Sequence, residues 1–210
     1  MMENLKPHER RHLRTKEAIL DAARRLLAEK GVNGVSLRAI AREIDYSPAG
    51  LYEYFDSKED IIHAVNSQGH EKLAAEMRRL DKDLPGPEYI RGLGQAYLHF
   101  ARTNPEHFML MFTTAPNGNQ LEQFMEEQSS FPILVSAIQR CIDEGYFALH
   151  PAGLYAMTMI FWTSVHGLAM LELTQLKDSG MDFEAINAII GQTIFLGLIS
   201  QNPDFKPPAQ

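Results

Sequence analysis

The stretch of sequence that decides the fold covers residues 18–62 and reads AILDAARRLLAEKGVNGVSLRAIAREIDYSPAGLYEYFDSKEDII. Its apolar residues recur every three or four positions, which predicts amphipathic helices. We expect one helix over about 15–29, ended by Gly31, because glycine favours the left-handed backbone found after a helix. A second helix is expected after Ser36 and a third from Ser47, since serine oxygens accept the unpaired N–H groups of a first helical turn.

The second and third of these helices are separated by only a few residues around Asp45. Aspartate tolerates a left-handed backbone, so a tight turn is compatible with this position. Two short helices with such a turn form a helix-turn-helix, in which the second helix enters the major groove of DNA. Leu51 and Phe55 are expected to face inward on that helix, and a fourth helix over about 58–81 supports it.

Helical periodicity continues through the rest of the chain, interrupted by glycine, proline and asparagine. Sustained alternation of the kind found in strands is absent from the sequence. We therefore predict an all-α fold of about nine helices. Beyond the break at Pro85, the expected helices cover about 88–102, a short segment opening at Pro105, and about 120–144, 152–175 and 183–200.

The charge distribution favours a DNA-binding segment joined to an acidic body. The 210 residues carry 20 Lys and Arg and 27 Asp and Glu, a net charge of −7, which argues against a general nucleic-acid coat. Residues 1–58 carry +2 and the remainder −9.

Other features of the sequence narrow the class of protein. The first residues contain no apolar signal-peptide core, and the apolar stretch 155–173 contains polar residues that indicate a buried helix. A cytoplasmic protein without membrane contact is expected. Cys141 is the only cysteine, which excludes an intrachain disulfide, and the scattered histidines predict no metal site.

Taken in order, the features of residues 18–62 resemble the DNA-binding signature of the TetR family of bacterial repressors. The match includes both helices that flank the helix-turn-helix. The residues that carry it are Ala22, Leu27, Gly31, Ser36, Ile40, Ala41, Ser47, Leu51, Tyr52, Tyr54, Phe55, Lys58 and Glu59. The resemblance implies a one-component transcriptional regulator that binds palindromic operator DNA as a homodimer, most often as a repressor.

The resemblance also implies which residues contact DNA. Ser36 and Lys58 match phosphate-binding positions at helix N-termini, and Tyr52 matches an aromatic position that contacts the DNA backbone and bases. Both serines can instead be helix caps alone, and Lys58 can be an ordinary surface lysine. The other expected contacts are Arg38, Tyr46, Ser47, Pro48, Ala49 and Tyr54.

The basic arm that precedes the first helix has two possible roles. Its arginines, Arg10, Arg11 and Arg14, can reach the minor groove or remain solvated. Within the third helix, Glu53 can accept a hydrogen bond from cytosine or point to solvent.

The second half of the chain resembles the variable half of the family, which holds an effector pocket and a dimer interface. The segment from Asn104 to Phe112 and the pattern Trp162-x-x-x-His166-Gly167 resemble one subgroup. We expect a DNA-binding domain over 1–60 with an arm over 1–14, and an effector-binding and dimerisation domain over 61–200. The helix over 58–81 connects them, and the tail over 201–210 is expected to be flexible.

Methionine and aromatic side chains of the second domain are expected to line a pocket for a small apolar or aromatic effector. The predicted lining is Phe108, Met111, Phe112, Phe124, Met125, Met157, Phe161, Trp162 and His166. His166 is equally compatible with helix packing. The predicted dimer interface contains Gly167, Phe183, Ile186, Ile190, Ile194 and Leu198.

Two further functions remain open at the level of sequence. A helical enzyme would have to use His166, Glu172 and Cys141, but their spacing follows no nucleophile–base pattern, so no enzyme and no cofactor is predicted. An activator, or a regulator controlled by a protein partner instead of a small ligand, would bind DNA in the same way as a repressor.

Overall fold

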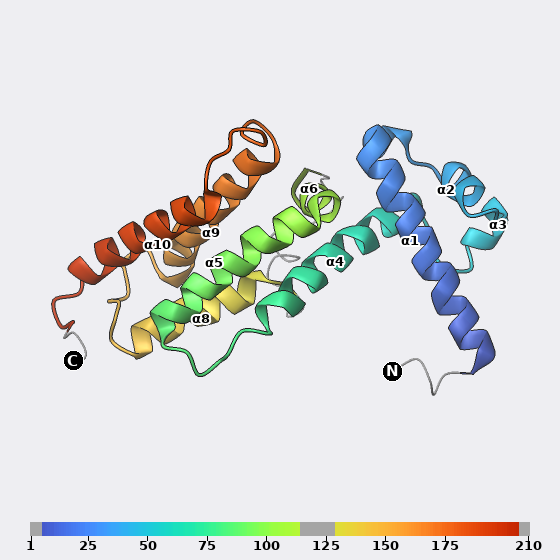
Figure 1. Ribbon diagram of the computed structural model, residues 1–210. Coiled ribbons are helices and arrows are strands. Elements are labelled where there is room, and N and C mark those ends of the chain that lie inside the picture. Colours follow the sequence, from blue (N-terminus) through green and yellow to red (C-terminus); the bar gives the residue numbers. More distant parts are fainter. Residues whose placement is uncertain (1–5, 114–128, 206–210) are drawn as a thin grey trace. The chain divides into compact units, whose positions relative to one another are not determined.

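The computed structural model describes residues 6–113 and 129–205, and over these ranges the chain forms nine α-helices and no strand (Figure 1). The predicted all-α fold is confirmed. The helices fall into two compact units. The first holds the described residues up to Gly69 together with 106–113, and the second holds 70–105 and 129–205.

The first unit contains the helix-turn-helix. It is built from α1 (Pro7–Gly34), α2 (Leu37–Glu43), α3 (Pro48–Leu51), the first half of α4 (Lys58–Met77) and nearly all of α6 (Pro105–Thr113). One apolar core joins these helices. Its buried side chains include Ile19, Ala22, Ala23, Leu26, Leu27, Val35, Ile40, Ala41, Leu51, Phe55, Ile61, Ile62, Val65 and Leu110.

Helix α1 begins earlier than the sequence predicted. Residues 7–14, expected as an arm, are helical from Pro7, where a proline suits the first helical turn. The Glu9 carboxylate accepts a hydrogen bond from the Lys6 backbone N–H at 2.7 Å, which closes the helix start. Near its other end the helix is interrupted at Gly31, whose φ of 65° confirms the predicted left-handed position.

The turn and the helix caps follow the sequence prediction. Asp45 has a φ of 51°, the left-handed conformation that the short turn requires. Ser36 Oγ accepts the Ala39 N–H at 3.1 Å, and Ser47 Oγ accepts the Gly50 N–H at 3.0 Å. Both serines therefore cap helices, which fixes the directions of α2 and α3.

The second unit contains the second half of α4 and a bundle of four helices: α5 (Gly86–Thr103), α8 (Phe131–Asp143), α9 (Leu154–Leu173) and α10 (Phe183–Ser200). In Figure 1, α5 runs through the bundle, and it packs against each of the other three helices. Phe100, Leu98 and Leu93 of α5 are almost completely buried. The unit therefore has an apolar core of its own.

Helix α8 begins later than predicted. Residues 120–128 of the expected helix over 120–144 lie outside the described residues; beyond them Ser129 and Ser130 are not helical, and α8 starts at Phe131. Pro132 explains the difference, because a proline is tolerated in the first turn of a helix but not within it. The end of the helix agrees with the prediction, since Gly145 follows it with a φ of 80°.

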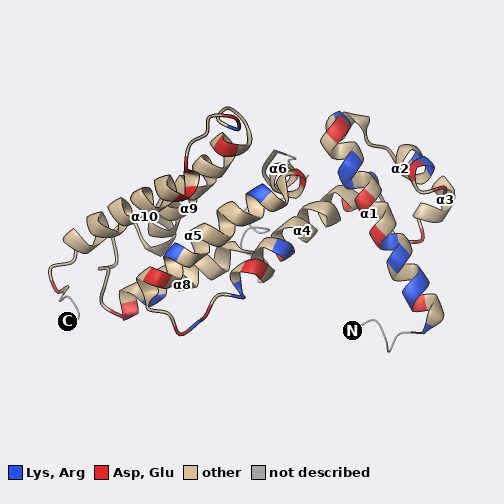
Figure 2. Cartoon of the chain, in the orientation of Figure 1, with Lys and Arg blue, Asp and Glu red and all other residues tan. Residues whose placement is uncertain are grey.

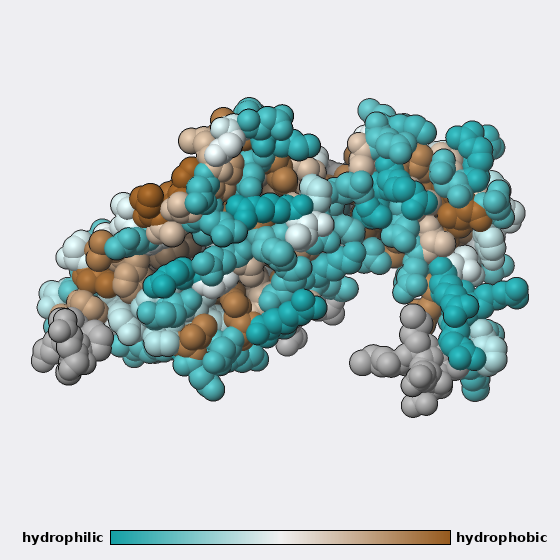
Figure 3. All heavy atoms as spheres, viewed as in Figure 1, coloured by the Kyte–Doolittle hydropathy of each residue, from teal (hydrophilic) through white to brown (hydrophobic). Residues whose placement is uncertain are grey.

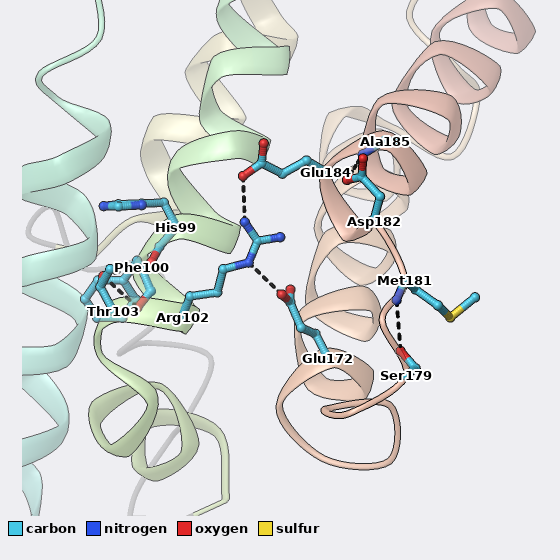
Figure 4. A network of polar contacts seen from close by, with 10 residues as sticks. All are labelled: His99, Phe100, Arg102, Thr103, Glu172, Ser179, Met181, Asp182, Glu184 and Ala185. Atoms are coloured by element: carbon cyan, nitrogen blue, oxygen red, sulfur yellow. Dashed lines mark hydrogen bonds and ion pairs between the residues drawn. The ribbon is translucent and has the colours of Figure 1, made fainter.

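Arg102 of α5 forms ion pairs with α9 and α10 (Figure 4). Its Nε donates to Glu172 Oε1 at 2.6 Å, and its Nη1 donates to Glu184 Oε1 at 2.6 Å. The bond to Glu172 is the main reason that the pKa of Arg102 is raised. The start of α10 is fixed separately, because Asp182 Oδ1 accepts the Ala185 N–H at 3.0 Å.

The imidazole of His70 on α4 makes stability sensitive to acid. Burial lowers its pKa from 6.5 to about 4. Between about pH 6.5 and pH 4, His70 is therefore protonated in the unfolded chain but neutral in the folded protein. We expect the free energy of unfolding to fall by about 3 kcal/mol over this interval because of His70, measured by urea unfolding. His70→Gln should flatten the profile, whereas His63→Gln, an exposed position on the same helix, should leave it unchanged.

Candidate DNA-binding surface and ligand cavity

The recognition helix α3 is held by very few contacts. It contains four residues, of which only Leu51 is buried. Phe55, just after the helix, adds a second buried side chain. The residues predicted to contact DNA here lie on the opposite, solvent-facing side: Tyr46, Ser47, Pro48, Ala49 and Tyr52 are all exposed. A surface of this kind can enter a groove without rearranging the core.

Predicted phosphate contacts lie on either side of α3. Ser36 and Arg38 are exposed at the start of α2. Lys58, at the start of α4, donates from Nζ to the Val32 carbonyl at 2.7 Å. An ammonium group has three donors, so this bond orients Lys58 and leaves donor capacity for a phosphate oxygen. The same bond joins the start of α4 to the end of α1.

Three aromatic rings connect α1 with the recognition helix. The His12 and Tyr54 rings stack with centroids 4.5 Å apart, and Tyr46 meets Tyr54 edge-on at 6.3 Å. The Tyr54 hydrogen bond is the main cause of a raised pKa at Tyr46. Tyr54 is thus half-buried within this cluster, whereas Tyr52 is 58% exposed. Of the two tyrosines, Tyr52 is the more exposed.

The second unit contains a cavity of about 710 Å³ among α5, α8, α9 and α10. Its walls are mostly apolar and aromatic. The charged side chains that line it, Glu88 and Arg91, lie 3.9 Å apart and are both well exposed. The deeper lining residues include Leu93, Tyr97, Phe131, Leu134, Phe161, Trp162, Ile190, Ile194 and Phe195.

A chain of polar contacts lies in the wall of this cavity. Trp162 hydrogen-bonds the Tyr97 side chain and, because an indole has only a donor, it donates to the phenol oxygen. The Tyr97 hydroxyl lies 2.9 Å from His166 Nδ1, to which it can donate its proton. Burial raises the pKa of Tyr97 and lowers that of His166, so both side chains are neutral at pH 7. Trp162 also stacks on His166 at 5.2 Å.

The structure brings only part of the predicted pocket to this cavity. Phe161 and Trp162 line it, and His166 reaches it through Tyr97. Phe108, Met111 and Phe112 lie on α6, which packs within the first unit. Met157 is buried but is not part of the lining. Phe124 and Met125 lie outside the described residues.

Two family models match the chain in the order of its two units. Residues 19–65 match the model of bacterial regulatory proteins of the tetR family. Residues 90–189 match the model of the tetracyclin repressor-like C-terminal domain. The chain belongs to the TetR family. It is therefore a DNA-binding transcriptional regulator, and the helix-turn-helix of α2 and α3 is its DNA-binding element.

Individual relatives agree with this assignment. The regulator Rv0681 of Mycobacterium tuberculosis is 22% identical over 82% of this chain and 76% of its own length. YobS of Bacillus subtilis is 31% identical over 45% of this chain, a match that spans only 49% of YobS. Both are described as uncharacterized HTH-type transcriptional regulators. The crystal structure of PfmR, a TetR-family regulator from Thermus thermophilus, superposes with a TM-score of 0.65 at 21% identity, covering 86% of this chain and 98% of PfmR.

TetR-family regulators are typically homodimers, and the helices α9 and α10 have apolar residues on their outer faces (Figure 3). Four exposed examples are Tyr155, Met159, Ile160 and Ile189. By length and composition both helices could also cross a membrane, a property shared by helices of soluble proteins. Two helices of this kind are weak evidence for a membrane span.

The residues predicted for the dimer interface of this TetR-family chain lie in different surroundings. Phe183 and Leu198 are already buried within one protomer, and Ile190 and Ile194 line the cavity. Ile186 is half-buried. At Gly167 on α9, apart from the neighbouring residues and the backbone of its own helical turns, no heavy atom of the described residues lies within 4 Å of the place that a Cβ would occupy. Packing inside the protomer therefore gives no reason for glycine at this position.

Two features of the candidate sites could not be read directly from the sequence pattern. Tyr97 lies on α5, far along the chain from Trp162 and His166, so no local spacing connects it with them. The basic first turns of α1 were assigned to an arm, although the Lys6–Glu9 contact is an available signal for a helix start. A Glu three residues after the N-cap is half of a capping box, and this signal could have been recognised.

Proposed function

We propose that this TetR-family protein is a homodimeric, cytoplasmic repressor that binds an inverted-repeat operator and is released by a small, neutral, largely apolar ligand. The observation that carries the proposal is the cavity of about 710 Å³ in the unit without the helix-turn-helix. Its volume is within the range of ligand sites, and its apolar walls contain a few polar groups, as such sites usually do.

The chemistry of the cavity supports a neutral ligand. Tyr97 and His166 are uncharged at pH 7, and Glu88 and Arg91 offset each other at the exposed edge. An ionised ligand would lose hydration there without gaining a buried counter-charge. An aromatic or aliphatic molecule with one hydrogen-bonding group fits the walls and the Tyr97–His166 pair.

The proposed dimer uses the outer faces of α9 and α10. Gly167 would allow the partner helix to approach closely, since a side chain there meets nothing in its own protomer. A dimer of this kind would place two recognition helices on one DNA molecule, about 34–36 Å apart for successive major grooves. The expected operator is therefore palindromic.

Release requires that the ligand bind better to a conformation with lower operator affinity, since only differential affinity shifts an equilibrium. Helix α4 is the direct covalent route for such a change. It begins in the unit of the helix-turn-helix and continues from His70 in the unit of the cavity. A ligand that moved its second half would change the spacing of the recognition helices.

The cavity can be tested with N-phenyl-1-naphthylamine, a neutral dye that fluoresces in apolar surroundings. We expect saturable fluorescence with the wild-type protein and its loss in Ile190→Trp, because the larger ring fills part of the cavity. Gln95→Trp, an exposed position on α5, is the matched control and should bind the dye normally. Equal dye binding by both variants would contradict a ligand site among these helices.

The enzymatic alternative would have to use Cys141 as its nucleophile. Cys141 is fully buried, and burial raises the pKa of its thiol to about 12, so it remains protonated at neutral pH. Glu172 is paired with Arg102, and His166 with Tyr97. The comparisons likewise place the chain among transcriptional regulators. Repression is distinguished from activation by a reporter assay in which the operator overlaps a promoter.

A further inference from the structure

The first two turns of α1 form a basic surface beside the recognition helix. Figure 2 shows Lys and Arg gathered along this end of α1. A shallow groove separates it from the start of the recognition helix, and its lining includes Arg10, Arg11, Arg14, Ile44 and Tyr46. Among the residues that the structure describes, no acidic one lines this groove. The charged side chains in the groove are thus three arginines, and Glu53 is the acidic residue that acts on Tyr46 at its edge.

This end of α1 is a helix with tertiary contacts and not an extended arm. The Lys6 N–H bond to Glu9 closes the helix start, and the His12 ring stacks on Tyr54. One turn further on, Lys16 Nζ lies 5.4 Å from the centre of the Phe55 ring. Because these contacts join α1 to the segment around α3, the helical turns that carry the arginines keep a fixed position relative to the recognition helix.

The arginines extend the reach of the DNA-binding unit. At about 1.5 Å per helical residue, positions 7–14 add about 12 Å to α1, more than three base-pair steps of about 3.4 Å. Guanidinium groups are suited to phosphate oxygens because they offer several N–H donors in a planar fork. DNA that contacts Tyr46 would therefore bring backbone phosphates to this surface.

We propose that Arg10, Arg11 and Arg14 form a second, phosphate-binding contact with the operator backbone. The contact rests on the proposed operator binding and strengthens it without selecting bases, because phosphates carry no direct sequence information. It also assigns a function to the additional turns of α1. The helix presents the three charges together, at less entropic cost than a flexible arm.

The test is the salt dependence of binding to a fluorescent duplex that carries the inverted repeat selected by the protein. Binding is measured by anisotropy between about 50 and 200 mM salt for wild type and for the triple variant Arg10→Gln, Arg11→Gln, Arg14→Gln. Each lost phosphate contact should reduce the slope of log K against log salt by about 0.9. At 0.1 M salt the same slope corresponds to about eightfold weaker binding per contact.

Two control proteins make the result specific. The triple variant Arg10→Lys, Arg11→Lys, Arg14→Lys keeps the charge and should retain most of the wild-type slope. The variant Arg79→Gln, Lys82→Gln, Lys177→Gln removes the same charge from exposed positions of the other unit and should leave the slope unchanged. Circular dichroism confirms that each variant is helical.

The outcomes separate this inference from the proposed function. Wild-type affinity and slope in the glutamine variant would overturn the phosphate contact while leaving operator binding intact. Equal weakening in the lysine and glutamine variants with an unchanged slope would also overturn it, because a positional role does not depend on charge. Failure of the wild-type protein to bind the selected duplex would overturn operator binding itself.

Discussion

Replacing Leu51 by alanine should abolish specific operator binding, although Leu51 itself is fully buried and cannot contact DNA. A helix of four residues is not stable by itself, and α3 buries only this side chain. The substitution should lower the free energy of unfolding by about 2–5 kcal/mol, because it removes apolar contacts and leaves a cavity. Binding is measured by anisotropy and stability by urea unfolding.

The neighbouring residue provides the matched control. Tyr52→Ala removes a 58% exposed side chain, so it should weaken operator binding while changing stability by less than about 0.5 kcal/mol. The two adjacent positions thus separate support of the recognition helix from contact with DNA. Normal operator affinity in Tyr52→Ala would contradict the assignment of this surface, and full stability in Leu51→Ala would contradict its role in the core.

The second large effect is expected at Gly167. The substitution Gly167→Leu should not destabilise the protomer, because a Cβ at this position meets open space and leucine forms helices better than glycine. In the proposed dimer the same side chain blocks the approach of the partner helix. We expect the dimer to weaken by more than about 3 kcal/mol, which is over a hundredfold in its dissociation constant.

Sedimentation velocity gives the oligomeric state of this variant, and anisotropy gives its operator affinity, which should fall together with dimerisation. Ser136→Leu adds the same side chain to an exposed position of α8 and should remain dimeric. Ile189→Glu, at a residue that is 64% exposed, should also dissociate the dimer, because association would bury a carboxylate. A fully dimeric Gly167→Leu variant would place the interface elsewhere.

The DNA-binding half could be predicted closely because its signals are local. Ser36, Ser47 and Asp45 each act through a neighbouring backbone group, so their identities and spacing are sufficient to predict the caps and the turn. The helix predicted over 183–200 agrees with α10, which spans Phe183–Ser200.

The orientation of α10 could not be predicted in the same way. This helix is apolar around much of its circumference, so periodicity does not identify the face that points inward. Ile190 faces the cavity, whereas its neighbour Ile189 faces solvent. The contact between Tyr97 and His166 could not be predicted either, because only the packing of α5 against α9 brings the two residues together.

The placement of α6 in the first unit also depends on contacts between residues that are far apart in sequence. Arg24 of α1 donates a hydrogen bond to the Glu106 carboxylate, and Leu110 belongs to the core of the first unit. Glycine at position 69 of α4 leaves space for the Met111 side chain of α6, because a Cβ at this position would lie 2.6 Å from that side chain. None of these pairs is close in sequence, so Phe108 and its neighbours were assigned to the pocket instead.

The most direct test of the central claim is selection of duplexes from a random pool by the purified dimer at a stated salt concentration. The account predicts enrichment of an inverted repeat whose half-sites lie about one helical turn, or roughly 34–36 Å, apart. A folded dimer, free of bound ligand, that enriched no sequence would contradict operator binding by α3.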